Sequence, residues 1–330
     1  MSQKSEPLAL GIDLGGTKIL TAVVTSRGEM LSRDHSITPA KQDHETVIRS
    51  VLESTERALR EAAATIETLD AIGIGVPGLS NPETGILFTS PNIPKLKDVP
   101  IREIIEKQLG KRAVLINDAN AAALGEFYFG AAKGASNFIY ITVSTGIGGG
   151  IVIDGKIYTG AIGTAGEVGH MTINDKGPPC KCGNRGCWEV LASGTALARE
   201  AKQKIKEGDK TDIMDFASGN IDMVTAEVIY KAAQNGDGLA GRLIRETGYY
   251  LGVGLASLIN IFNPELVVIG GGLSNIGDML LEPAIREAKK RAFKTPFQAV
   301  RFERARLGRN SGVLGAAAFS LEEINRLNKL

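Results

Sequence analysis

Short runs of β-branched and apolar residues, separated by turn-forming residues, open the chain. They lie at residues 8–13, 18–25 and 29–37. This pattern is typical of a β-meander, in which tight turns join neighbouring antiparallel strands. From Thr46 to Leu69 the apolar positions instead recur three or four residues apart with charges between them, which predicts an amphipathic helix. The opening segment is therefore predicted to be an α/β unit that begins with strands.

The rest of the chain alternates between strand and helix patterns, and part of it repeats the opening. Strands are predicted at residues 71–77, 113–118, 137–143, 151–154, 157–160 and 265–273, and helices at 120–130, within 193–260 and at 312–328. Residues 137–160 repeat the order of strand, Gly-rich turn, strand, Asp/Gly turn and strand. Two such copies predict two related α/β lobes with a cleft between them. A single doubly wound sheet fits less well, because parallel strands need crossover connections rather than hairpins.

Composition narrows the class of protein. The chain has 330 residues, 43% of them hydrophobic, which is long enough for more than one core. Its 38 basic and 37 acidic residues nearly cancel, which argues against nucleic acid or a membrane surface as the main partner. The first residues are polar and resemble no signal peptide, and the longest weakly polar run, residues 248–262, is shorter than a bilayer span. Cysteines without evident partners fit a reducing compartment, so we expect a cytoplasmic protein.

Glycines gather at the ends of the predicted strands. Residues 73–78 match the spacing of a dinucleotide fingerprint, but turn residues follow them where that motif needs a helix. No P-loop pattern occurs. Residues 13–18 place a carboxylate, two glycines, a hydroxyl and a cation in one tight turn, which suits an anion and Mg²⁺. An ordinary hairpin is the alternative. A similar turn at Thr145 and Gly146 suggests two hairpins that clamp a polyphosphate.

Asp118 lies where a predicted strand meets a predicted helix. An aspartate at such a point can be the N-cap, whose side chain accepts from free N–H groups of the first turn. It can equally be a general base that removes the proton from a substrate hydroxyl. The pattern leaves both roles open.

All three cysteines lie within eight residues. Cys180, Cys182 and Cys187 follow His170 closely, and three thiolates with one imidazole are the count for a closed tetrahedral zinc site. A disulfide with an odd thiol, an Fe–S centre and three unrelated free thiols are the alternatives. Four protein ligands leave no position for water, so such a zinc would be structural. Glu167 and Glu189 flank the ligands and suit a polyhydroxylated molecule.

Together the segments DLGGTK, TGIGGGIVIDGKIYTGAIGTAGEVGH, CKCGNRGCWE and VVIGGGL resemble the ROK family of bacterial repressors, open-reading-frame proteins and sugar kinases. The resemblance runs from Leu8 to about Ala318. It implies a two-lobed actin/hexokinase-like (ribonuclease H-like) ATPase fold. Residues 1–120 are expected to form an N-terminal lobe on which the C-terminal helix, 312–330, packs, and residues 121–311 a C-terminal lobe that contains the cysteines.

The resemblance also implies site residues for ATP, Mg²⁺, a hexose and structural Zn²⁺. The implied catalytic base is Asp118. The implied sugar-binding residues are Asn92, Asn117, Asp118, Glu167, His170 and Glu189. The implied ATP and phosphate residues are Asp13, Gly15, Gly16, Thr17, Lys18, Thr145, Gly146, Gly270, Gly271 and Gly272. The implied zinc ligands are His170, Cys180, Cys182 and Cys187, so His170 would contact metal and sugar from opposite ring nitrogens.

The expected function is that of an ATP-dependent hexose kinase, a glucokinase that makes the 6-phosphate. Only about seven residues precede the first strand, whereas the family's repressors carry an N-terminal helix-turn-helix domain, and this favours the kinase branch. N-acetylglucosamine, N-acetylmannosamine, mannose and fructose are alternative substrates, and polyphosphate is an alternative donor. A sugar-binding regulator without catalysis is the alternative class. The family implies a dimer or tetramer.

Overall fold

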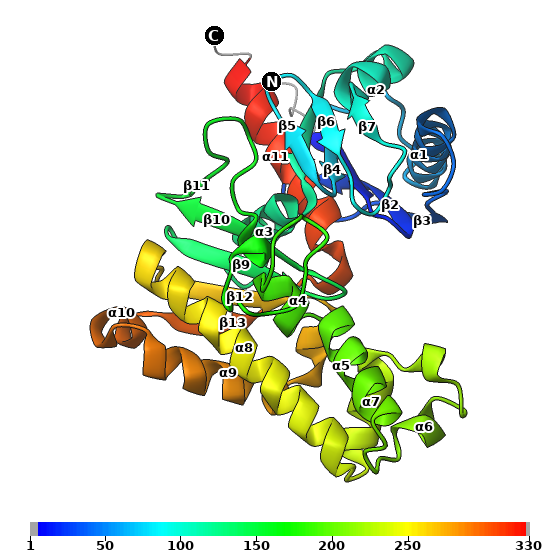
Figure 1. The fold of residues 1–330 in the computed structure, drawn as a ribbon. Coiled ribbons are helices and arrows are strands. Elements are labelled where there is room, and N and C mark those ends of the chain that lie inside the picture. The colour runs from blue at the N-terminus through cyan, green and yellow to red at the C-terminus, as the bar shows by residue number, and fades with distance from the viewer. Residues whose placement is uncertain (1–5, 328–330) are drawn as a thin grey trace. The chain divides into compact units, whose positions relative to one another are not determined.

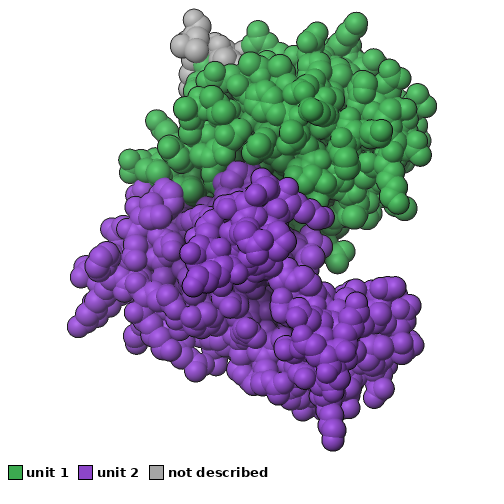
Figure 2. Space-filling view, viewed as in Figure 1, with its two compact units in different colours: residues 1–136, 150–166, 305–330 green, residues 137–149, 167–304 purple. Residues whose placement is uncertain are grey.

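The computed structural model describes residues 6–327, and these form two compact units. Unit 1 contains the chain up to residue 136, residues 150–166 and the chain from residue 305 onward. Unit 2 contains residues 137–149 and 167–304. Figure 1 shows the elements and Figure 2 colours the two units. The chain passes between the units four times.

Strands and helices alternate along the chain. The strands are β1 Leu8–Leu14, β2 Lys18–Thr25, β3 Asp34–Ile37, β4 Ala71–Val76, β5 Leu79–Asn81, β6 Ile86–Thr89, β7 Lys97–Val99, β8 Ala113–Asn117, β9 Phe138–Val143, β10 Ile147–Ile153, β11 Lys156–Ile157, β12 Leu266–Gly270 and β13 Arg301–Arg304. The α-helices are α1 His44–Glu61, α2 Ile101–Leu109, α3 Asp118–Phe129, α4 Trp188–Ala192, α5 Gly194–Lys206, α6 Ile213–Phe216, α7 Ala226–Gln234, α8 Gly238–Phe262, α9 Asp278–Arg291, α10 Lys294–Ala299 and α11 Ser311–Leu327. Short 3₁₀ turns are η1 Val168–His170, η2 Ile221–Met223, η3 Gly272–Ile276 and η4 Gly308–Asn310.

Two five-stranded sheets share one topology. Their orders are β3-β2-β1-β4-β8 and β11-β10-β9-β12-β13. In the first, β1 to β3 pair antiparallel, and β4 and β8 add in parallel. In the second, β12 and β13 run parallel with β9, whereas β10 pairs antiparallel with β11. The repeated order confirms the predicted duplication of the meander.

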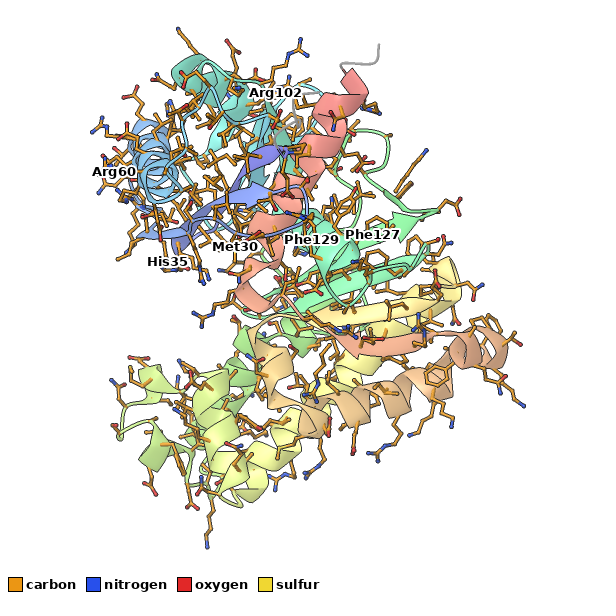
Figure 3. All side chains as sticks on the ribbon, turned by 180° about the vertical axis from the view of Figure 1, so that it is seen from behind. Met30, His35, Arg60, Arg102, Phe127 and Phe129 are labelled. Atoms are coloured by element: carbon orange, nitrogen blue, oxygen red, sulfur yellow. The ribbon has the colours of Figure 1, made fainter. Side chains whose placement is uncertain are left out.

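The first sheet has helices on both faces. On β1, Leu10 and Ile12 are buried in a cluster with residues of α1. The intervening Gly11 faces α11, where a Cβ would overlap the carbonyl oxygen of Val313, so helix and strand touch backbone to backbone. On this face Ala9 and Val24 of the sheet are buried in a second cluster with Val313 of α11. Met30 and Phe129, labelled in Figure 3, pack against that cluster. The alternation of β1 therefore places one face against α1 and the other against α11.

Several element boundaries differ from the sequence prediction; β11, for example, covers Lys156–Ile157 rather than residues 157–160. The helix predicted to reach Leu69 ends at Glu61, because Ala63 takes a left-handed conformation (φ 51°) that a helix cannot continue through. The third strand begins at Asp34 rather than at residue 29. Residues 148–150 belong to β10 instead of a turn, and a Cβ on Gly150 would come within 2.5 Å of Ala123 Cβ. These glycines allow close packing rather than chain reversal.

One small sheet was not predicted at all. Strands β5, β6 and β7 form a three-stranded antiparallel sheet within unit 1. They are short and separated by Pro- and Asn-rich turns, so their period of two covers too few residues to stand out. Among residues 6–327, none of the helices has both the length and the apolar character needed to cross a membrane.

Candidate active site

The first glycine turn lies between β1 and β2 in unit 1. The N–H of Gly15 donates to the carbonyl of Lys18 (2.9 Å), which closes the turn. Thr38 holds it from outside, since its hydroxyl donates to the Gly15 carbonyl (2.7 Å). A Cβ on Gly16 would come within 2.5 Å of Asn92 Cβ, so only glycine lets Asn92 approach the turn this closely. The structure thus brings together two predicted site residues that are 76 positions apart.

Asp13 stands at the end of β1, on the face that α11 covers. Its two carboxylate oxygens lie 2.8 and 3.3 Å from the position that a Cβ on Gly312 would take, so the carboxylate sits against the first turn of α11. Burial raises the pKa of Asp13 to about 6, and the nearby charge of Lys18 opposes the rise only in part. The Lys18 cation balances the charge of this partly buried carboxylate only in part. Such a carboxylate is suited to holding Mg²⁺.

The start of α3 shows how Asp118 is held. The N-cap is Asn117, whose Oδ1 accepts from the N–H groups of Ala119 (2.9 Å) and Asn120 (3.1 Å). Its Nδ2 donates to the carbonyl of Gly78 (3.2 Å). Asp118 is the first helical residue, half-buried, and its Oδ1 accepts from the N–H of Ala119 (2.8 Å). The N-cap position is therefore Asn117, and Asp118, the next residue, shares the Ala119 N–H with it.

The second glycine turn lies between β9 and β10 in unit 2. The N–H of Ser144 donates to the carbonyl of Gly146 (2.8 Å). Glu189 Oε2 accepts from the N–H of Ile147 (3.0 Å), and a Cβ on Gly146 would overlap that oxygen. Glu189 therefore supports this turn directly, which its position next to the cysteines does not reveal.

Gly270 ends β12, and the two glycines that follow it pack against the same turn. Gly271 has a φ of 86°, and a Cβ there would overlap the carbonyl oxygen of Val143 at the end of β9. A Cβ on Gly272 would lie 3.6 Å from Ser144 Oγ. Unit 2 thus brings two of the three predicted nucleotide glycines, Gly271 and Gly272, next to the predicted phosphate turn, while Gly270 is buried at the end of β12.

His170, Cys180, Cys182 and Cys187 come together in unit 2. Their ligand atoms all lie within 4.8 Å of one another. The Cys182 and Cys187 sulfurs are 3.6 Å apart, and Cys180 Sγ is 3.7 Å from His170 Nδ1. Zinc–sulfur bonds of about 2.3 Å in a tetrahedron require sulfurs about 3.8 Å apart, which these distances match. Burial raises the pKa of the Cys187 thiol to about 12, so a cation is needed to hold its thiolate.

Tight turns and one aromatic anchor shape this cluster. Gly183 and Gly186 take positive φ values of 95° and 62°, as short loops around shared ligands require. Trp188, next to Cys187, is fully buried and donates from Nε1 to the carbonyl of Tyr250 on α8 (2.9 Å). A Cβ on Gly254 would overlap its indole ring. The indole thereby fixes one end of the cluster to the long helix.

His170 joins the cluster to a carboxylate. While Nδ1 faces Cys180, Nε2 lies 3.9 Å from Glu167 Oε2. Burial raises the pKa of Glu167, and Glu189 raises it further, whereas His170 lowers it. About 41% of the Glu167 side chain remains accessible. The two ring nitrogens of His170 thus face different partners, as a metal ligand with a second contact would require.

A family comparison decides what kind of chain this is. The model of the ROK family matches residues 9–323. The chain belongs to the ROK family.

ROK relatives match nearly the full chain. A glucokinase of Halalkalibacterium halodurans is 36% identical over 97% of this chain and 97% of its own. A xylose repressor of Caldicellulosiruptor bescii is 36% identical over 96% of this chain and 78% of its own. The structure of a ROK glucokinase from Streptomyces griseus, in complex with glucose and AMPPNP, is 34% identical with a TM-score of 0.84, covering 96% of this chain and 99% of that one. These similarities confirm the predicted actin/hexokinase-like α/β fold class.

The sequence motifs did not identify every residue that supports the candidate site. Thr38 and Trp188 lie outside the glycine motifs, and the anchoring role of Glu189 depends on a contact 42 residues away. The sequence does contain one indication that Trp188 is an anchor. It directly follows Cys187 in a short turn, and a large aromatic residue in such a turn usually packs into a core.

A separate cavity in unit 1 takes in only one of the predicted site residues. It measures about 760 Å³ and is lined by Asn117, with β8, α2 and the end of α11. Neither Asp13 nor Asp118 lines it. We therefore build the proposed function on the glycine turns and the carboxylates rather than on this cavity.

Proposed function

We propose that the protein is an ATP-dependent hexose kinase, specifically a glucokinase, that transfers the γ-phosphate of ATP to the sugar 6-hydroxyl. The observation that carries the proposal is the half-buried carboxylate of Asp118 at the start of a helix that Asn117 caps. A base held in this way can accept the proton of a hydroxyl as it attacks phosphorus. The ROK relatives named glucokinase support the choice of sugar.

Each unit supplies its own groups to the proposed reaction. In unit 1 the turn of Gly15, Gly16, Thr17 and Lys18 presents N–H groups, a hydroxyl and a cation to phosphate oxygens. In unit 2 the turn at Thr145 and Gly146, with Gly270, Gly271 and Gly272, serves the nucleotide. Asp13 would hold Mg²⁺, which supplies positive charge to the phosphates. Asp118 then accepts the proton from the 6-hydroxyl.

Sugar recognition is assigned mainly to the groups around the cysteine cluster. His170 Nδ1 with the Cys180, Cys182 and Cys187 sulfurs would hold a structural Zn²⁺. With Nδ1 taken by the metal, His170 Nε2 carries the proton and donates toward sugar oxygens. Glu167 and Glu189 offer acceptors, and Asn92 and the remaining N–H of Asn117 are proposed to contact the same sugar. Other hexoses, polyphosphate as donor, a cytoplasmic location and a dimer or tetramer remain predictions.

A second candidate is a sugar-responsive regulator that does not phosphorylate its ligand. The xylose repressor relative favours it, since that protein is as similar in sequence as the glucokinase. The two predictions differ at Asp13 and Asp118, because a pure binder needs neither a metal-holding carboxylate nor a base.

A coupled assay with Mg-ATP and a panel of hexoses tests the proposal. We expect turnover with glucose above that with mannose, fructose and the N-acetylated sugars. Asp118→Asn keeps the size of the side chain but cannot take the proton, so kcat is expected to fall by about 100- to 10,000-fold while sugar still binds. Asp98→Asn is the control: Asp98 is exposed in the same unit, and its left-handed backbone (φ 54°) accepts asparagine readily. Sugar binding without product in the wild type would support the regulator instead.

A further inference from the structure

Glu126 is a buried carboxylate that the proposed mechanism does not use. It lies near the end of α3 and is completely inaccessible to solvent. The rest of this helix is built largely of alanine and other apolar residues, so a charged side chain here is an exception. A buried carboxylate is tolerated only where hydrogen-bond donors surround it.

Four donors surround the Glu126 carboxylate. Oε1 accepts from the N–H of Leu307 (2.9 Å) and the hydroxyl of Ser311 (3.1 Å). Oε2 accepts from the N–H groups of Ala131 (2.8 Å) and Arg306 (3.1 Å). Three of these donors belong to the segment that leads into α11. The carboxylate therefore ties the end of α3 to the entry of α11.

The first turn of α11 is the part of the structure that meets Asp13. Gly312 has no room for a Cβ beside the Asp13 carboxylate, and Gly125 and Gly315 bring α3 and α11 into backbone contact. The position of that turn thus depends on two supports: the packing of glycines along the helices, and the Glu126 carboxylate at the entry. Both supports act on Ser311, because Gly125 packs against its carbonyl oxygen, but only the Glu126 carboxylate also holds Arg306 and Leu307.

We propose that Glu126 is a positioning residue for the phosphate-transfer step, acting through the first turn of α11 on Asp13. With the carboxylate in place, Arg306, Leu307 and Ser311 are fixed, and the first turn of α11 stays against Asp13. A helix N-terminus favours negative charge, so its placement helps keep Asp13 ionised and aligned for Mg²⁺. This inference rests on the proposed kinase function.

The test variant is Glu126→Gln. It preserves the side-chain volume but places an NH₂ donor against backbone N–H donors, which loosens the entry of α11. We expect kcat to fall about 100-fold, since a displacement of about 1 Å near reacting groups costs about that much. The Mg²⁺ concentration for half-maximal rate should rise about tenfold, while the KM for glucose changes less than about twofold. Ser311→Ala, which removes one donor, should shift both quantities in the same direction but less.

A double-mutant cycle separates positioning from general destabilisation. If Glu126 acts through Asp13, Glu126→Gln should change kcat by less than about twofold in an Asp13→Asn background. The control is Glu287→Gln, because Glu287 is also a buried acid but pairs with Arg291 in unit 2. It should lower the melting temperature without changing the Mg²⁺ dependence. Full effects of Glu126→Gln in the Asp13→Asn background, or an unchanged Mg²⁺ dependence, would overturn the inference.

The inference and the proposed function can fail separately. A wild type that phosphorylates no hexose contradicts the kinase proposal. Titration calorimetry of AMPPNP with and without Mg²⁺ still measures the effect of Glu126 in that case. Glu126→Gln should lose about tenfold of the Mg²⁺-dependent gain in affinity, and an unchanged gain would count against the positioning role.

Discussion

The two glycine turns follow the same strand-turn-strand pattern but are supported in different ways. The turn of unit 1 carries its own charges, with Asp13 before it and Lys18 at its end, and neutral groups such as Thr38 hold its backbone. The turn of unit 2 has no charged residue, and an external carboxylate, Glu189, holds it. One copy therefore supplies charge and the other supplies shape. The two turns thus share a strand order but differ in the residues that support them.

Among changes that compare the two units' turns and their supports, the largest effect is expected where the charge before the first turn is removed. Asp13→Asn should lower kcat by about 100- to 1,000-fold, because charge stabilisation of the transferring group is lost. The variant should fold at least as well as the wild type. The pKa of Asp13 is raised by burial to about 6, so its ionisation costs folding free energy that is absent below pH 3.8 and complete above about pH 6.

The same shift predicts a pH dependence. As the pH falls through about 6, Asp13 takes up a proton and kcat/KM should decline, whereas Asp13→Asn should lack this acidic limb. Rate profiles of both proteins from pH 5 to 8 and thermal melts at each pH measure the two effects. An unchanged acidic limb in the variant would assign it to another group.

An intermediate effect is expected when the His/Cys cluster, which supports the proposed sugar-binding residues, is disrupted. Cys182→Ser removes one thiolate from the His/Cys cluster, so zinc content should fall from about one per chain toward zero. The KM for glucose should rise at least about tenfold, because groups that orient a metal-linked site typically contribute that much. Elemental analysis and kinetics check this, with the exposed Ser218→Ala as control. If the variant kept full activity without metal, the cluster would have no role in sugar binding and would only hold the local fold together.

The smallest effect is expected from a shape change in the second turn. Gly146→Ala places a Cβ on Glu189 Oε2, which must move and cost about 1–3 kcal/mol of stability. The KM for ATP should rise severalfold while the glucose KM changes less. Gly238→Ala is the matched control, because it starts a helix of the same unit with open space around it. Equal effects of both substitutions on ATP would remove the turn from nucleotide binding.

The amino-acid sequence by itself determined the local patterns of this protein. Apolar alternation predicted the duplicated meander, the glycine clusters marked both turns, and the spacing of three cysteines after one histidine predicted the four-group cluster. Such features depend on neighbours close along the chain, where strand period, turn chemistry and ligand spacing act directly.

Only the tertiary structure decided which side chains support those patterns. Glu126 meets Leu307 across 181 positions, Glu189 meets Ile147 across 42, and Asp13 meets Gly312 across the sheet face. The end of α1 at Glu61 and the sheet of β5, β6 and β7 were likewise not predicted from the sequence. Contacts between distant segments depend on how whole elements pack. The local pattern of apolar and polar residues therefore does not predict that a given carboxylate will be buried, or which donors will surround it.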